Sequence, residues 1–100
     1  MSQNLIITRS SHFKSDYKKL TVSEQEAIDE TIQKIIFYKQ TRTAPYGLRI
    51  KQLQSKIYEA RQGISTRVIF FSHKNTLRLI TLGNHDDILR ALKQIDKLNH

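Results

Sequence analysis

The sequence contains no cysteine and no tryptophan, and its 100 residues include only one proline and three glycines. Without cysteine the chain can form no disulfide and can offer no thiolate as a nucleophile or as a zinc ligand. No stretch approaches the roughly 20 apolar residues of a membrane span, and the N-terminus lacks the basic and apolar regions of a secretory signal. We therefore expect a single cytoplasmic domain over residues 1–100, with one core.

Sequence motifs of several enzyme classes are also missing. The chain has no phosphate-binding loop, no glycine-rich dinucleotide turn, no paired-histidine metal signature and no serine elbow of a hydrolase. The four histidines stand far apart in the sequence, at His12, His73, His85 and His100. This scatter argues against metal catalysis, so we predict no metal site and no cofactor.

Negative charge is scarce in the middle of the chain. Residues 39–78 hold nine Lys or Arg residues and a single acidic residue, Glu59. Their net charge of +8 equals that of the whole protein, because the other residues hold eight basic and eight acidic side chains. A basic field confined to one part of a small domain suggests a polyanionic partner, either nucleic acid or an acidic protein. A solvated face that promotes solubility is the plainer alternative.

Short runs of apolar and β-branched residues predict five strands, over residues 4–9, 48–53, 57–61, 66–71 and 76–82. In the second of these runs, Leu48 and Ile50 alternate with Arg49 and Lys51, which predicts a strand with one basic face. The run over residues 66–71 is almost entirely apolar and predicts a central strand that is covered on both faces.

Helical periodicity predicts two helices between the first two strands and one after the last strand. The longest should begin with a capping box in which Ser23 and Glu26 satisfy each other's backbone amides. The last should begin near Asn84 or Asp86. The order β-α-α-β-β-β-β-α predicts an α+β fold with helices packed on one face of a small, mostly antiparallel sheet.

Two arginines flank the turn between the third and fourth predicted strands. A hairpin would bring Arg61 and Arg67 close together, where their guanidinium groups repel unless an anion bridges them or Glu59 pairs with one. The planar guanidinium suits phosphate oxygens. The pair is therefore either a phosphate clamp or an exposed strand residue beside a structural Glu59–Arg ion pair.

His85 follows Gly83 and Asn84 at the junction of the last strand and the last helix. An imidazole there could serve as a general acid or base, or could contact a phosphate at the start of the helix. The competing interpretation is a polar residue in a helix-capping turn. Among the aromatic residues near the basic segment, Tyr46 and Tyr58 could stack on an RNA base, but core packing is favoured for both.

The run KIYEARQGISTRVIFF, followed by TLRLITLGNHDDILRAL, resembles the RelE/ParE superfamily of toxins from bacterial toxin–antitoxin systems. The Arg-hydrophobic element of that family corresponds to residues 67–70, with Thr66 in place of the usual tyrosine. Its Gly-x-His element corresponds to residues 83–85. The resemblance covers residues 48–92, and it implies a compact toxin of one domain that a cognate antitoxin wraps and neutralises.

The resemblance also implies one of two activities. RelE-like members cut messenger RNA in the ribosomal A site without a metal ion, whereas ParE-like members inhibit DNA gyrase. Under the first activity, the implied catalytic residues are Arg67, His85 and Arg61. The residues expected to bind the RNA backbone are Arg49, Lys51, Lys56 and Arg78.

The sequence departs from the nuclease pattern in its last helix. Nuclease members often carry a tyrosine or phenylalanine there, and residues 88–100 contain no aromatic residue. Our leading hypothesis is a metal-independent, ribosome-dependent endoribonuclease. The alternatives are a gyrase inhibitor with no nuclease activity, and a non-toxic member of the family that only binds an acidic partner.

Overall fold

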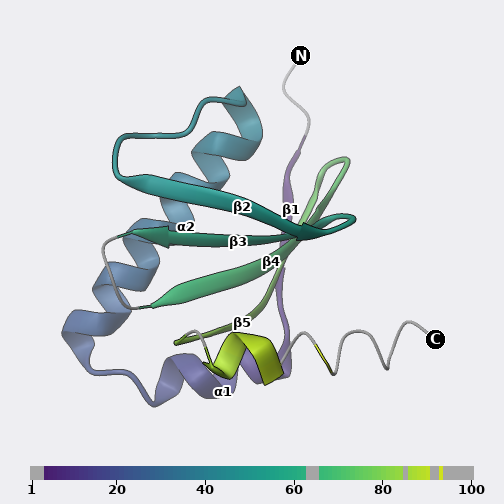
Figure 1. Ribbon diagram of the computed structural model, residues 1–100. Helices are drawn as coiled ribbons and strands as arrows, with labels where there is room; N and C mark the ends of the chain where they lie inside the picture. Colours follow the sequence, from purple (N-terminus) through teal and green to yellow (C-terminus); the bar gives the residue numbers. More distant parts are fainter. Residues whose placement is uncertain (1–3, 63–65, 85, 91–92, 94–100) are drawn as a thin grey trace.

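A computed structural model of the protein describes residues 4–62, 66–84, 86–90 and 93 (Figure 1). The elements in chain order are β1 (Ile6–Arg9), α1 (Ser11–Lys18), α2 (Val22–Thr41), β2 (Leu48–Gln54), β3 (Ile57–Gln62), β4 (Arg67–His73) and β5 (Thr76–Gly83). Residues 86–90 are helical. The predicted order of elements and the α+β class are confirmed.

The strands form one five-stranded sheet in the order β1-β5-β4-β3-β2. Strands β2 to β5 run antiparallel as a meander, and only a few residues separate each strand from the next along the chain. Strand β1 pairs with β5 in parallel, so the sheet is mixed with a single parallel pair. The two helices between β1 and β2 provide the long connection that separates the two edge strands.

The capping box of α2 involves different residues from those predicted. The Thr21 side chain accepts a hydrogen bond from the Glu24 amide at 3.2 Å, and the Glu24 carboxylate accepts one from the Thr21 amide at 2.9 Å. The predicted Ser23–Glu26 box is therefore wrong. The sequence holds the same spacing twice, and the helix begins at the earlier copy.

Helices α1 and α2 cover one face of the sheet, behind the strands in Figure 1. Alternate residues of the strands point into this interface, as the two-residue period of a β-strand requires. The main core consists of Phe13, Ile28, Ile32, Ile35, Leu48, Ala60, Val68, Phe70, Leu77, Leu79 and Leu82.

The opposite face of the sheet carries a smaller core. Ile57 and Ile69 lie on this face, and Ile88 from the helical segment after β5 packs against them. That segment lies in front of the sheet in Figure 1. The central strand β4 therefore has buried residues on both faces, as its apolar run predicts.

The helical segment after β5 begins at Asn84, in agreement with the predicted start. The Asn84 side chain accepts from the Asp87 amide at 2.9 Å, and the Asp87 carboxylate accepts from the Asn84 amide at 3.1 Å. This reciprocal pair satisfies two amides that a helix start leaves without a partner. None of the helices in the described part of the chain combines the length and hydropathy that a membrane span requires.

Candidate functional site

Three arginines lie side by side across the sheet. The register of the strands pairs Arg49 of β2 with Arg61 of β3, and pairs Arg61 with Arg67 of β4. Directly paired residues of an antiparallel sheet have Cβ atoms about 5 Å apart, so the three side chains form a row on one face. We call Arg49, Arg61 and Arg67 the arginine row.

Glu59 is the acidic partner of this row. Its carboxylate Oε1 lies 3.2 Å from the Nε of Arg67, and the two side chains are only 15% and 18% exposed. Glu59 is also paired across the strands with Lys51. One carboxylate therefore stands among four cations, so positive charge remains in excess at this end of the sheet.

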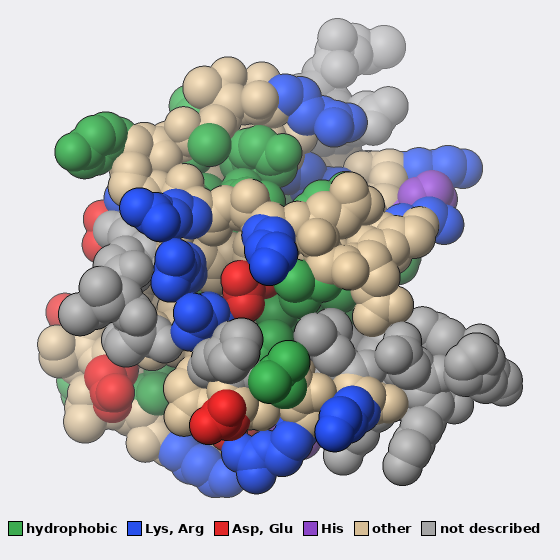
Figure 2. Space-filling view, in the orientation of Figure 1, with side chains coloured by type: hydrophobic (Ala, Val, Ile, Leu, Met, Phe, Trp, Pro, Cys, Tyr) green, Lys and Arg blue, Asp and Glu red, His purple; other side chains and the backbone are tan. Residues whose placement is uncertain are grey.

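A hollow of about 380 Å³ opens over the arginine row. Basic side chains form part of its wall, and apolar residues from β2 and from the segment after β5 form the rest. Its lining consists of Arg49, Ile50, Lys51, Leu53, Glu59, Arg61, Arg67, Ile88 and Leu89. Figure 2 shows Lys and Arg side chains gathered on this face of the sheet, with an acidic side chain among them.

Seven residues are predicted from the sequence to be catalytic or to bind RNA. Four of them line the hollow, namely Arg49, Lys51, Arg61 and Arg67. The hollow does not include Lys56, which occupies the turn between β2 and β3 with a φ of 67°, or Arg78, which is exposed on β5 opposite Phe71. Both residues are several positions along the strands from the arginine row. His85 lies outside the described residues, although its neighbours Asn84 and Asp86 are described.

The two tyrosines near the basic segment differ in their surroundings. Tyr58 stacks on Phe70 with ring centroids 5.5 Å apart, on the helix-covered face of the sheet, as core packing predicts. Tyr46 is 99% exposed, so the prediction that it packs in the core is wrong. Its position in the loop between α2 and β2 explains the difference, since no second element covers it.

The apolar wall of the hollow is the part of the site that the sequence does not predict. Ile88 and Leu89 fall within the predicted last helix, and their presence beside the arginine row depends on how the chain turns after Gly83. The structure holds, among residues 4–62, 66–84, 86–90 and 93, no group of three or more His, Asp or Glu side chains placed to bind a metal ion.

The arrangement can bind an anion of tetrahedral geometry. Three guanidinium groups and Lys51 supply only hydrogen-bond donors, and the partly buried positions of Arg61 and Arg67 strengthen their interaction with a phosphate. The carboxylate of Glu59 would hold Arg67 in place until such an anion arrives.

No family model matches the sequence, and no curated protein matches it either. Solved structures do match in fold. A chain of the DinJ–YafQ complex from E. coli is 17% identical with a TM-score of 0.66, and the match covers 85% of this chain and 98% of that one. A chain of the RelB–RelE antitoxin–toxin complex from Methanococcus jannaschii is 15% identical with a TM-score of 0.62, over 83% of this chain and 95% of that one.

A copper-bound mutant toxin from Helicobacter pylori is also similar, with 16% identity and a TM-score of 0.64 over 84% of this chain and 98% of that one. Identities this low establish a shared fold. The fold is shared over nearly the whole of each of these solved chains.

Proposed function

Because the chain has the fold of RelE-superfamily toxins, we propose that it is the toxin of a type II toxin–antitoxin system and acts as a metal-independent, ribosome-dependent endoribonuclease. The observation that supports this activity best is the arginine row with its hollow. A site for RNA cleavage must bind a phosphate and stabilise the charge that develops on it, and both tasks need converging cationic donors.

The proposed reaction uses the RNA's own 2′-hydroxyl as the nucleophile. The 2′-oxygen forms a bond to the adjacent phosphorus while the bond to the 5′-oxygen breaks, which leaves a 2′,3′-cyclic phosphate and a 5′-hydroxyl. A base removes the proton of the 2′-hydroxyl, and an acid donates a proton to the departing 5′-oxygen. Arg67 and Arg61 would stabilise the extra negative charge on the phosphate oxygens in the transition state.

His85 is the proposed general acid or base of this reaction. It follows Asn84, whose side chain caps the helical segment and fixes the backbone immediately before the histidine. A positioned acid or base contributes about 10²–10⁴ in rate. Lys56, which the sequence predicts to contact the RNA backbone, lies away from the arginine row and has no role in the proposed catalytic step.

The proposed partners follow from the same fold. Several of the matched solved structures are complexes of a toxin with its antitoxin, so we propose that a cognate antitoxin covers this chain, in the cytoplasm, with an acidic contact surface. The ribosome and messenger RNA are the proposed targets.

The test is to express variants briefly in a bacterial host and to map the cut sites in its messenger RNA. We expect Arg67→Ala and His85→Ala to lower cleavage by about 10²-fold or more and to relieve growth arrest. His12→Ala, an exposed residue of α1, is the control and should leave cleavage unchanged.

Gyrase activity measured in the same cells addresses the other toxin class. The RelE and YafQ chains described above do not support gyrase inhibition. Folded Arg67→Ala and His85→Ala variants that cut messenger RNA as well as the wild type would refute the nuclease proposal.

A further inference from the structure

A second group of cations lies at the other end of the sheet from the arginine row. It consists of Lys39, Arg42, Lys56, His73 and Lys74, and we call it the hairpin-end cluster. Lys56 and Lys74 occupy the turns β2–β3 and β4–β5, and Lys39 and Arg42 belong to the end of α2. Arg61 and Lys56 are five residues apart on an extended chain, so the two groups are separated by about 17 Å.

The members of this cluster influence one another's charge. The pKa of His73 is lowered by the positive charge of Lys56, by desolvation and by the charges of Lys74 and Lys39. The pKa of Lys39 is lowered by burial and by the charge of Arg42. None of the ion pairs formed among the described residues includes a member of the cluster.

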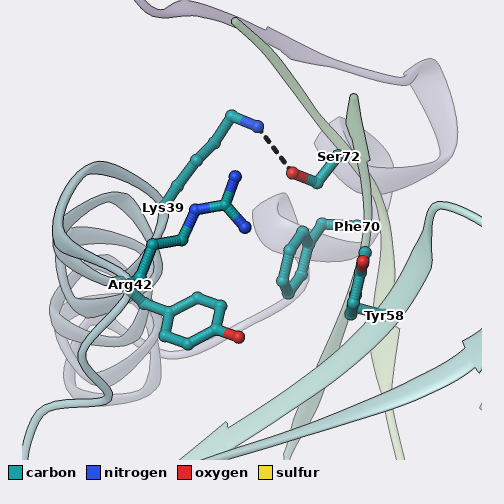
Figure 3. Close-up of a pocket in the computed structure, with 6 residues that line it drawn as sticks. Lys39, Arg42, Tyr58, Phe70 and Ser72 are labelled. Carbon is teal, nitrogen blue, oxygen red and sulfur yellow. Dashed lines mark hydrogen bonds between the residues drawn. The ribbon is translucent and has the colours of Figure 1, made fainter. Parts of the chain in front are cut away.

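Part of the cluster lines a pocket of about 160 Å³ between α2 and the sheet. In Figure 3 the side chains of Lys39 and Arg42 extend from the helix into this space. The Lys39 ammonium donates to the Ser72 hydroxyl at 2.6 Å, and the stacked rings of Tyr58 and Phe70 form an apolar wall. A pocket of this size accommodates one phosphate-sized group and presents it with two cations.

The backbone at three of these residues adds an independent observation. Arg42, Lys56 and Lys74 have φ angles of 63°, 67° and 52°, and they are the non-glycine residues with positive φ in the described part of the chain. Such positions favour glycine or asparagine, and another residue there costs about 1 kcal/mol. Positive φ is itself common at a helix C-cap and in a two-residue hairpin turn, so the informative feature is the residue type found there. All three strained positions carry a cation and all three belong to one cluster.

We propose that the hairpin-end cluster is a second binding site for RNA phosphates, with one phosphate in the pocket between Lys39 and Arg42. Neighbouring phosphates of the same strand would contact Lys56 and Lys74. The cluster is rich in lysine, which is depleted from protein–protein interfaces but is a principal contact of the nucleic-acid backbone. The choice of RNA rests on the proposed function, whereas the anion site itself does not.

The test measures binding separately from cleavage. The probe is a fluorescently labelled 2′-O-methyl oligouridylate, which cannot be cut because its 2′-oxygen is blocked. We expect the Lys39→Gln/Arg42→Gln variant to bind about tenfold more weakly at low salt, a loss equivalent to about one charge-assisted hydrogen bond. The slope of log affinity against log salt should become shallower by about 0.7 for each phosphate that the variant no longer neutralises.

The matched control is Lys14→Gln/Lys18→Gln, which removes the same charge from exposed positions of α1. It should retain nearly the wild-type affinity and slope. Equal losses in both variants would show that only net charge matters, and would overturn the proposal.

A second variant tests whether any loss of RNA binding comes from a folding defect. Lys56→Asn/Lys74→Asn places a residue suited to positive φ in both turns, so it should raise the melting temperature and still weaken binding of the probe. Unchanged binding in this variant and in the pocket variant would overturn the proposal. So would unchanged RNA binding together with weaker binding of polyglutamate, which would assign the cluster to an acidic protein.

The nuclease proposal and the proposal of a second RNA-binding site can be refuted independently. If the pocket variant loses binding while the wild type cuts no messenger RNA in cells, only the nuclease proposal is refuted. If cleavage depends on Arg67 but the pocket variant binds the probe normally, only the second site is refuted.

Discussion

Glu59 is the residue on which the charge balance of the arginine row depends. Its carboxylate lies 3.2 Å from Arg67, and both side chains are mostly buried. Removing the carboxylate leaves three facing arginines and Lys51 without a compensating charge. An anion from solution could then replace it, so Glu59 and a phosphate compete for the same guanidinium group.

For Glu59→Gln we expect the free energy of unfolding to fall by about 1–2 kcal/mol, between the values of exposed and buried ion pairs. Inorganic phosphate should restore part of this loss, because it can bridge the arginines. Urea unfolding with and without phosphate measures both effects. The control is Glu30→Gln, since Glu30 is 60% exposed and its ion pair with Lys34 should contribute less than about 0.5 kcal/mol. Equal losses in the two variants, or no phosphate effect on Glu59→Gln, would contradict this account.

At the scale of elements, close packing and hydrogen bonds constrain the junction between β5 and the helical segment. A Cβ atom on Gly83 would lie 2.7 Å from both the Cβ and the Oδ2 of Asp87. Asp87 cannot move away freely, because its carboxylate and amide are both hydrogen bonded to Asn84. Gly83 is also the strand partner of Arg67, so this junction lies next to the arginine row.

Gly83→Ala should therefore lower the free energy of unfolding by about 2–3 kcal/mol through overpacking, and should reduce cleavage by shifting the backbone before His85. Gly47→Ala is the comparison, since Gly47 has a φ of 87° but no atom within 4 Å of an added Cβ. Gly47→Ala should lower the free energy of unfolding by only about 1 kcal/mol, which is the cost of a side chain at positive φ. Thermal unfolding distinguishes the two, and a smaller loss for Gly83→Ala than for Gly47→Ala would be inconsistent with the close approach of Asp87.

On the scale of the whole molecule, the sheet separates two unlike faces. Helices α1 and α2 cover one face over the main core. Within the described part of the chain, the segment after β5 packs on the other face. The arginine row lies on this second face, beside Ile88 and Leu89. The same small core that stabilises this face also forms a wall of the proposed catalytic site.

Ile88 is 2% exposed and packs against Ile57 and Ile69. We expect Ile88→Ala to lower the free energy of unfolding by about 2–4 kcal/mol, as a buried large-to-small change does. Leu89→Ala, at a side chain that is 47% exposed, should cost less than about 1 kcal/mol. Denaturant unfolding of both variants checks this, and similar values for the two would mean that the segment does not seal the second face.

Much of the fold follows from periodicity in the sequence. Alternation in the run over residues 48–53 predicts which side chains face the helices, because successive residues of a strand point to opposite faces. The start of α2 does not follow in the same way, since two Ser/Thr-x-x-Glu patterns overlap there and the local sequence does not choose between them. The exposure of Tyr46 does not follow either, because composition does not reveal which loops stay uncovered.

The candidate site is predictable in part. A hairpin between the third and fourth strands places Arg61 opposite Arg67, and short turns limit the possible registers. The inclusion of Arg49 requires the register of β2 on β3 as well, which the β-bulge near Gln52 makes hard to read from sequence. Lys56 and Arg78 have the right charge but lie elsewhere along the strands.

By itself, the sequence determined the charge, the strand and helix pattern, and the presence of a basic sheet face, because these depend on composition and on local periodicity. Tertiary structure decided which cations meet. The strand register aligned Arg49, Arg61 and Arg67 around one carboxylate, and the packing of α2 on the sheet brought Lys39 and Arg42 to the hairpin ends. Distances between residues far apart in the chain depend on how elements pack, and no local pattern encodes them.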